Sequence, residues 1–199
     1  PYTTLFRSIG IKYLTVYAFS TENWSRPADE VSALMLLLRN YLKNCKKTAS
    51  KNDMRVRVIG DRSALDEDIV RAIDELEAFS KDFDGLHFTI ALNYGSRDEL
   101  VRAVNAIIKD RDSGVLPMDT GIDQATISSY LDTSELPDPD LLIRTSGEER
   151  LSNFLLWQCA YTEFYFTDVH WPDFNEEELK KAVEAYAGRN RKFGGIKEE

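Results

Sequence analysis

The chain has 199 residues, of which 43% are hydrophobic and 30% are charged, so it can pack one domain of the usual size, about 100–200 residues. It carries 25 basic and 34 acidic residues, a net charge of −9, and a chain this acidic lacks the basic excess that binds nucleic acid. The two cysteines, Cys45 and Cys159, exclude a disulfide scaffold. The longest apolar run, from Ala33 to Leu38, is far shorter than the roughly 20 residues of a membrane span. We therefore expect a cytoplasmic protein.

The pattern of apolar residues alternates between strand and helix along the chain. Runs of β-branched and aromatic residues predict strands, and apolar residues at steps of three and four predict helices. The predicted strands cover residues 12–19, 54–59, 86–93, 141–144 and 163–166, and the predicted helices cover residues 28–45, 65–79, 96–112 and 176–191. This alternation implies right-handed crossovers, so we predict an α/β fold, a single domain with a mostly parallel central sheet flanked by helices.

Two of these helices carry further signals. Ser96 and Glu99, three residues apart, predict a capping box at the start of the helix over 96–112. The helix over 28–45 is apolar nearly all round at residues 34–38, whereas a surface helix needs only one apolar stripe. Either this helix is buried on several sides, or one side packs on the sheet and another lines an apolar cavity.

Polar segments follow three of the predicted strands, at residues 20–24, 93–95 and 144–147. Ligands of parallel α/β sheets bind outside the carboxyl ends of the strands, so we expect the functional residues there. The segment over 19–27 admits two interpretations. It is either a connecting loop with turn formers and a capping serine, or a site that presents hydroxyls, an amide and an arginine beside Trp24.

Arg144 and Arg150 flank a turn of small residues. The arginine fork suits phosphate oxygens, and backbone amides of a turn add donors, so this segment is a candidate phosphate or diphosphate pocket. The alternative is a surface ion pair with Glu148 or Glu149. Glu163 begins an aromatic strand, where a buried carboxylate needs a partner, and that partner is either Mg²⁺ or a nearby arginine.

Six segments, in this order and at this spacing, resemble the cis-prenyltransferase family, and within it the bacterial undecaprenyl diphosphate synthases. They are residues 20–27 (STENWSRP), 93–95 (NYG), 143–154 (IRTSGEERLSNF), 157–163 (WQCAYTE), 169–174 (VHWPDF) and 189–195 (RNRKFGG). The resemblance implies a prenyltransferase that condenses isopentenyl diphosphate onto an allylic diphosphate, usually farnesyl diphosphate. The product is a polyprenyl diphosphate lipid carrier with cis double bonds, which the cell uses in wall synthesis.

The resemblance also implies Mg²⁺ as cofactor and an apolar tunnel for the growing chain, with walls at residues 34–38, Leu86 and Leu92. It implies a homodimer, in which residues 189–195 approach the active site of the partner subunit, and a peripheral contact with the membrane for product release. Carried over residue by residue, it makes Asn23 the catalytic residue that helps to remove a proton, and Glu163 the metal ligand. It assigns substrate binding to Ser20, Thr21, Glu22, Trp24, Arg26, Arg144, Arg150, Leu151 and Ser152.

The sequence departs from the family in its first motif, a strand and phosphate-binding loop that reads Met-Asp-Gly-Asn-Gly-Arg-Trp. Residues 1–8 match nothing in the family and equal the translation of a common sequencing adapter, so we expect a foreign segment there. We expect residues 9–199 to form a cis-prenyltransferase domain that lacks its N-terminal strand, phosphate loop and first helix, and therefore turns over weakly or not at all. The alternative is a non-catalytic partner subunit of the same fold, which the presence of Asn23, Arg144 and Glu163 disfavours.

Overall fold

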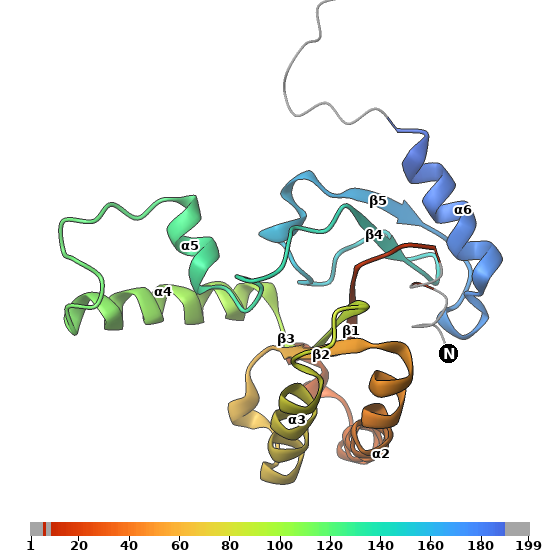
Figure 1. The fold of residues 1–199 in the computed structure, drawn as a ribbon, viewed down its shortest axis with the longest axis horizontal. Coiled ribbons are helices and arrows are strands. Elements are labelled where there is room, and N and C mark those ends of the chain that lie inside the picture. The colour runs from red at the N-terminus through yellow and green to blue at the C-terminus, as the bar shows by residue number, and fades with distance from the viewer. Residues whose placement is uncertain (1–5, 7–8, 190–199) are drawn as a thin grey trace, which may run out of the picture. The chain divides into compact units, whose positions relative to one another are not determined.

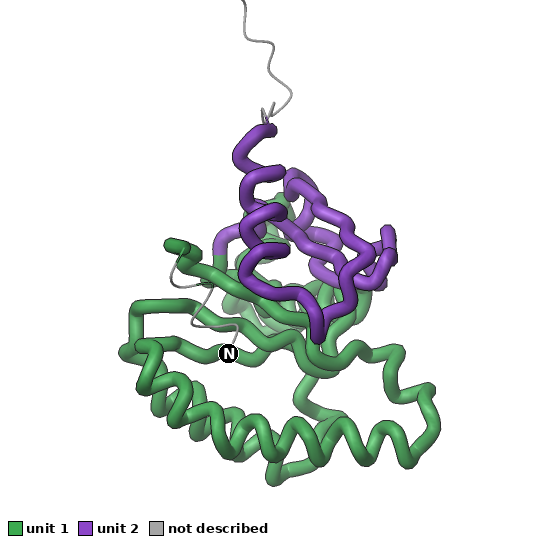
Figure 2. Tube along the Cα trace, turned by 90° about the vertical axis from the view of Figure 1, so that its right-hand side faces the viewer, with its two compact units in different colours: residues 1–136 green, residues 137–199 purple. Residues whose placement is uncertain are grey.

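The computed structural model describes residue 6 and residues 9–189, so the predictions for residues 1–5, 7–8 and 190–199 lie outside the described residues. The chain divides into two compact units, residues 1–136 and 137–199, which Figure 2 distinguishes by colour. The first unit contains β1 (Tyr13–Ser20), η1 (Thr21–Ser25), α2 (Ala28–Asn52), β2 (Met54–Ile59), η2 (Arg62–Ala64), α3 (Glu67–Ser80), β3 (Leu86–Tyr94), α4 (Ser96–Asp112) and α5 (Gln124–Tyr130). The second contains β4 (Leu141–Arg144), η3 (Gln158–Tyr161), β5 (Glu163–Phe166), η4 (Trp171–Asp173) and α6 (Glu176–Ala187).

Each predicted strand and helix is present, and the α/β fold class is confirmed. The strands of the first unit form a parallel sheet in the order β1-β3-β2 (Figure 1), and β4 pairs with β5 in a second parallel sheet. The strands of the described residues therefore lie in two sheets, where the sequence predicted one.

The largest differences from the predicted helices are at α2 and α5. Helix α2 continues to Asn52, because its last two turns are polar outside and bury only Cys45, Ala49 and Asn52, a pattern too sparse to extend the predicted helix. Asp53 ends it in the left-handed conformation, with φ 49°. Helix α5 was missed, since its seven residues contain little apolar periodicity and its start depends on Asp123, whose carboxylate accepts from the Thr126 N–H.

The predicted capping box at the start of α4 is wrong. Gly95 is the N-cap residue and Ser96 is already helical. The Glu99 side chain accepts instead from the Tyr94 hydroxyl and from the Asp132 N–H, at 2.6 and 3.0 Å. The Glu99 carboxylate therefore bonds Tyr94 and Asp132 in place of the predicted capping contact.

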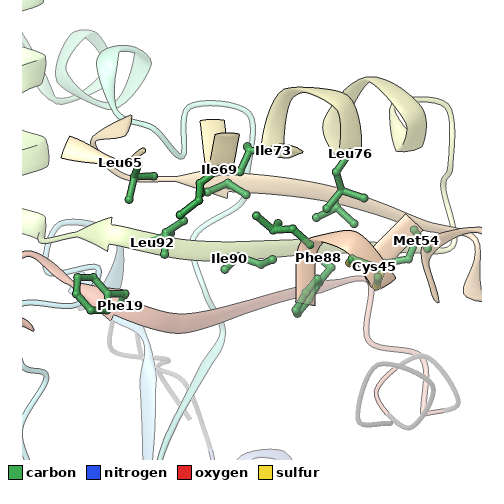
Figure 3. Packing of buried hydrophobic residues seen from close by; sticks show 14 of the residues in the cluster. Phe19, Cys45, Met54, Leu65, Ile69, Ile73, Leu76, Phe88, Ile90 and Leu92 are labelled. Carbon is green, nitrogen blue, oxygen red and sulfur yellow. The ribbon is translucent and has the colours of Figure 1, made fainter. Parts of the chain in front are cut away.

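Helices α2 and α3 lie side by side on one face of the three-stranded sheet (Figure 1). Alternate residues of the strands point to that face, and Figure 3 shows Ile69, Ile73 and Leu76 of α3 packed against Phe88 and Ile90 of β3. Both cysteines, Cys45 and Cys159, are buried and free.

The expected tunnel walls do not all line a cavity of this core. Leu86 and Leu92 are at most 2% exposed within the packed cluster, whereas Leu36 and Leu37 of α2 are 58% and 64% exposed. The exposure of Leu36 and Leu37 contradicts a helix that is buried on several sides at residues 34–38. Leu34, Met35 and Leu38 pack on the core, as the other alternative requires of one side of the helix, and the cavity on another side is untested. The apolar tunnel stays a prediction.

Side chains close the outer edge of β2, the end strand of the described three-stranded sheet. The N–H groups of Val56, Val58 and Gly60 donate to Ser80 Oγ, Glu77 Oε1 and Asp132 Oδ2, at 3.0, 2.8 and 3.0 Å. Edge N–H groups without a partner invite pairing with another chain. Residues of α3 and of the segment after α5 therefore occupy these N–H groups, which are then not free to pair with another strand.

We expect Ser80→Ala to lower the free energy of unfolding by about 1–3 kcal/mol, because it leaves the Val56 N–H buried without an acceptor. Ser80 is fully buried. Urea denaturation followed by circular dichroism measures the change. Ser32→Ala is the matched control, since the exposed Ser32 hydroxyl bonds only its own helix, to the Ala28 carbonyl oxygen. Equal midpoints for the two variants would contradict the edge-closing role.

Candidate functional site

The carboxyl ends of β1 and β3 form the first cluster of predicted site residues. Because the two strands are parallel, Ser20 lies opposite Tyr94. The 3-10 helix η1 follows β1 directly, and the Ser20 N–H donates to Asn23 Oδ1 at 2.8 Å. This bond turns the chain so that Ser20 and the predicted catalytic Asn23 lie together. Asn23 is half-buried at this end of the sheet.

Trp24 is fixed by β3. Its indole Nε1–H donates to Asn93 Oδ1 at 2.7 Å, and its ring contacts Phe19 edge-on, with centroids 5.1 Å apart. Asn93 in turn donates from Nδ2 to the Asp61 carbonyl oxygen, also at 2.7 Å. One amide side chain therefore joins the segments that follow β1, β2 and β3.

The other predicted substrate-binding residues of this segment lie at the surface. Thr21 donates from Oγ1 to Glu22 Oε2 at 3.2 Å, and Arg26 forms an ion pair with Glu30 one helical turn on. The Arg26 and Glu30 side chains are 48% and 46% exposed, so solvent screens this pair and it holds Arg26 only weakly. An anionic ligand can compete for the guanidinium there.

A buried polar network lies behind this cluster. Arg102 donates to both carboxylate oxygens of Asp132, at 2.9 and 2.7 Å, and Asp132 also receives the Gly60 N–H. Burial raises the pKa of Tyr94 above its ordinary value, and the adjacent Glu99 carboxylate raises it further. The phenol therefore stays protonated and serves as a donor to Glu99, which is only 1% exposed. Sequence patterns do not predict this network, since Asp132 lies 30 residues from Arg102 and 33 residues from Glu99.

The second cluster lies at the carboxyl ends of β4 and β5. Residues 144–147 turn back onto the chain after β5, and the N–H groups of Ser146 and Gly147 donate to the carbonyl oxygens of Val169 and Thr167, at 2.9 and 3.0 Å. Ser146 has φ 69°, so the turn is tight. These two amides are bonded to backbone carbonyl oxygens and are therefore not donors for a phosphate. That other amides of this segment add donors stays a prediction.

Arg144 and Arg150 differ in their partners. Arg150 is 66% exposed and pairs with Glu148, which is the surface ion pair that the sequence left open as an alternative. The Nε of Arg144 is buried and has no hydrogen-bond partner among the described residues. A buried donor without an acceptor is costly, and an anion at the end of β4 would supply the acceptor.

Leu151 and Ser152 continue from this segment. Ser152, Asn153 and Leu155 have φ values of 48°, 62° and 47°, which side chains rarely adopt. Ser152 is exposed and Leu151 is half-buried. Strained turns of this kind cluster at ligand-binding segments, where the surrounding structure holds them.

Glu163 does not lie with Arg144 in the second unit. The register pairs Leu141 with Glu163 and Arg144 with Phe166, so the two charged residues start and end the sheet, about 10 Å apart at 3.3 Å per residue. Alternation along the strands also places them on opposite faces. Arg189 donates from Nη1 to Glu163 Oε2 at 2.5 Å, so of the two partners that the sequence allowed, the structure shows the arginine.

His170 also lies at the second cluster. Its Nδ1 lies 3.3 Å from Ser146 Oγ, across the ends of β4 and β5. In the described residues no three His, Cys, Asp or Glu side chains gather in a way that could hold a metal ion.

Comparison with known proteins decides the family. The model of the prenyltransferase family described as undecaprenyl diphosphate synthase matches residues 2–194. The chain belongs to this family. Its cis-prenyltransferase relatives include the isoprenyl transferases of Fusobacterium nucleatum and Clostridium perfringens, which are 53% and 50% identical to it. Each match spans 95% of this chain, and 79% and 74% of the respective relative.

Solved structures of the same family share the fold. The lavandulyl diphosphate synthase of Lavandula x intermedia, crystallised with dimethylallyl diphosphate, superposes with a TM-score of 0.91 at 41% identity, covering 96% of this chain and 83% of that one. A probable undecaprenyl diphosphate synthase of Campylobacter jejuni gives a TM-score of 0.85 at 35% identity, covering 96% and 87%. Within the described residues, no helix of this cis-prenyltransferase is long and apolar enough to cross a membrane.

We expect Tyr94→Phe to destabilise the prenyltransferase by about 1–3 kcal/mol, because the buried Glu99 carboxylate loses one of its donors. The change in the denaturation midpoint measures it. Tyr130→Phe is the matched control, since it removes a bond of similar length, 2.8 Å to Asp110, nearer to solvent. The network has no special role if both variants lose the same stability.

Proposed function

We propose that this protein condenses isopentenyl diphosphate with an allylic diphosphate such as farnesyl diphosphate, and builds a cis-polyprenyl diphosphate lipid carrier. The observation that carries the proposal is the buried Arg144 Nε, which has no protein acceptor in the described residues and lies at the carboxyl end of a parallel strand. Membership of the family supports it. That a solved relative binds dimethylallyl diphosphate supports an allylic diphosphate as the second substrate.

The condensation requires cationic groups beside the diphosphate that leaves, because negative charge develops there. During condensation the allylic carbon–oxygen bond breaks, a carbon–carbon bond forms and a proton leaves isopentenyl diphosphate. Preorganised donors lower the barrier most when they face the departing charge. Arg144 is fixed by the strand and offers such donors, whereas Arg150 must first release Glu148. We assign the binding of the diphosphate of isopentenyl diphosphate to Arg144, Arg150, Leu151 and Ser152.

Ser20 and Asn23 supply the second half of the proposed chemistry. Asn23 accepts the Ser20 N–H through Oδ1, which orients its amide at the end of β1. We assign to Asn23 the role of helping the proton to leave, and to Thr21, Glu22, Trp24 and Arg26 the contacts with the substrates. The geometry of each unit is compatible with these roles.

Mg²⁺ is the cofactor that family membership favours, with Glu163 as its ligand. The described residues do not fit a resident ion, because Glu163 is one carboxylate, it is held by Arg189, and no group of three ligating side chains accompanies it. Mg²⁺ commonly binds through one or two carboxylates together with substrate phosphates. An ion at Glu163 would therefore need diphosphate oxygens and the release of Arg189.

A homodimer is the assembly that we propose, with α4 as its contact. The exposed face of α4 carries an apolar row, Val101, Val104 and Ile108, which are 59%, 47% and 51% exposed. Arg97 and Asp112 stand at the two ends of the same face. A second copy of α4 packed antiparallel would set Val101 against Ile108 of the partner subunit, and Arg97 against Asp112 of the partner subunit, twice in one two-fold contact.

The proposed cellular location of the enzyme follows from its lipid product, and its expected turnover rate follows from its sequence motifs. We propose a cytoplasmic enzyme that touches the membrane peripherally when the lipid product leaves. The chain contains no Asp-Gly-Asn-Gly-Arg-Trp motif, so we expect slow turnover. Polyprenyl products from radiolabelled isopentenyl diphosphate, farnesyl diphosphate and Mg²⁺ measure it.

We expect Arg144→Lys to weaken the binding of isopentenyl diphosphate by about 10- to 100-fold, since a lysine cannot reproduce charge-assisted bonds from the arginine fork. Isothermal titration with isopentenyl diphosphate measures the dissociation constant. Arg71→Lys, on the exposed face of α3, is the control and should bind as the wild type does. Equal affinity in the wild type and the Arg144 variant would overturn the assignment.

We expect Val104→Asp to convert dimers into monomers, because it places a charge in the centre of the apolar row. Light scattering after size exclusion gives the mass. Leu37→Asp, a change of the same kind at a residue that is 64% exposed on α2, should leave the mass unchanged. A wild type that is monomeric at all concentrations rules out α4 as a dimer contact.

A further inference from the structure

Asn93 lies at the end of β3, in the polar segment 93–95, and has no functional role assigned to it above. It is only 3% exposed, and its φ of 47° is a left-handed conformation that asparagine tolerates better than most residues. Its side-chain oxygen accepts the Trp24 indole N–H, and its side-chain nitrogen donates to the Asp61 carbonyl oxygen, each at 2.7 Å. Both ends of the amide are therefore used, in opposite directions.

The backbone around Asn93 is held just as closely. The Asp61 N–H donates to the Asn93 carbonyl oxygen at 3.1 Å. Gly60 has φ 118°, and a Cβ there would lie 2.0 Å from the Leu92 carbonyl oxygen, so the chain after β2 packs directly on the end of β3. Asn93 thus stands on a rigid base, made from the ends of two strands.

Helix η1 is short and lies at the surface. It spans five residues, and none of them is buried. Trp24 reaches the sheet through its ring contact with the buried Phe19 and through the bond to Asn93. Apolar contact leaves a ring free to slide, whereas a hydrogen bond from the indole N–H fixes its position and direction.

We infer that Asn93 is a positioning residue for the condensation: through Trp24 it fixes η1, and through η1 it sets the place of Asn23 and Ser20. This inference rests on the proposed function for its catalytic consequence, but the contact itself is independent of it. Asn93 does not touch the reacting atoms. Displacement of a catalytic group by about 1 Å costs on the order of 100-fold in rate, so a lost tether shows in kcat.

Asparagine meets three demands that other side chains meet only in part. Glycine keeps the left-handed backbone but loses both hydrogen bonds. Aspartate keeps the acceptor for Trp24 but has no N–H for the Asp61 carbonyl oxygen. The expected order of effect is therefore wild type, then Asn93→Asp, then Asn93→Gly, and rescue by the aspartate distinguishes a tether from a mere need for a tolerant backbone.

The first experiment observes the contact without substrate. The chain has three tryptophans, so ¹⁵N-labelled full-length protein gives three indole N–H signals, and Trp24→Phe identifies that of Trp24 by its loss. In Asn93→Gly the Trp24 signal should move upfield and exchange faster with solvent, while the other two stay. Asn93→Asp should keep the signal near its wild-type position. An unmoved Trp24 signal in Asn93→Gly overturns the inference.

The second experiment measures turnover of the full chain, with enzyme in excess over substrate so that slow condensation is still seen. Asn93→Gly should lower the rate about 10- to 100-fold, with the dissociation constant for isopentenyl diphosphate unchanged. Trp24→Phe should lower it similarly, and the double variant should be no slower than the worse single one, because both remove the same bond. Additive losses would contradict a shared tether.

Tyr17→Phe is the matched control. It removes a hydrogen bond of 2.9 Å from β1 to the Tyr94 carbonyl oxygen, one residue beyond Asn93, without touching Trp24. Its Trp24 signal and its rate should equal those of the wild type. If the wild type forms no polyprenyl product even under these conditions, the proposed function fails, while the Trp24 signal still decides whether Asn93 holds η1.

Discussion

Parallel pairing of β1 with β3 is the constraint on which the first cluster depends. It sets Ser20 beside Tyr94 at one end of the sheet, and the chain must leave both strands there. Because the carboxyl ends of β1 and β3 lie side by side, the residues of η1 can contact the end of β3, as Trp24 does through its bond to Asn93. If β1 slipped by one residue, Phe19 would leave the core and the carboxyl ends would no longer match. The same constraint governs β4 and β5, whose ends bring His170 to Ser146.

The described arginines of this acidic protein differ in whether they form ion pairs. Most of the described arginines that lie near acidic side chains are paired with them, and the pairs include Arg39 with Asp66 and Asp68, Arg62 with Asp74 and Glu77, Arg102 with Asp98 and Asp132, Arg150 with Glu148, and Arg189 with Glu163. The Nε groups of Arg111 and Arg144 are instead buried without an acceptor among the described residues. Arg111 lies on α4, whereas Arg144 lies at the carboxyl end of β4. The buried Arg144 Nε can thus donate to an anionic ligand at the end of β4.

The sequence predicted what local patterns control. Apolar periodicity located the strands and the longer helices, and the motifs located Asn23, Trp24 and Arg144 at strand ends. It could not predict which charges would pair, since Arg189 lies 26 residues from Glu163 and Asp132 lies 30 residues from Arg102. The sequence also misassigned Glu99. A glutamate can complete a capping box or accept from a buried tyrosine hydroxyl, and the residue type alone does not distinguish the two roles. The contacts of Asn93 were not predicted for a related reason: the motif at residues 93–95 locates the asparagine, but it does not show that its side chain bonds Trp24 and Asp61.

The side chains of α3 that bond the outer edge of β2 also limit where residues can be inserted or deleted in this protein. Glu77 and Ser80 are one turn apart on α3, and they meet Val58 and Val56, which are two residues apart on the strand. One residue inserted into α3 before Glu77 would rotate both side chains by about 100° and detach them together, since the helix has 3.6 residues per turn. Insertions and deletions should therefore accumulate in the connections at either end of this helix, while its own length stays fixed among descendants of this chain.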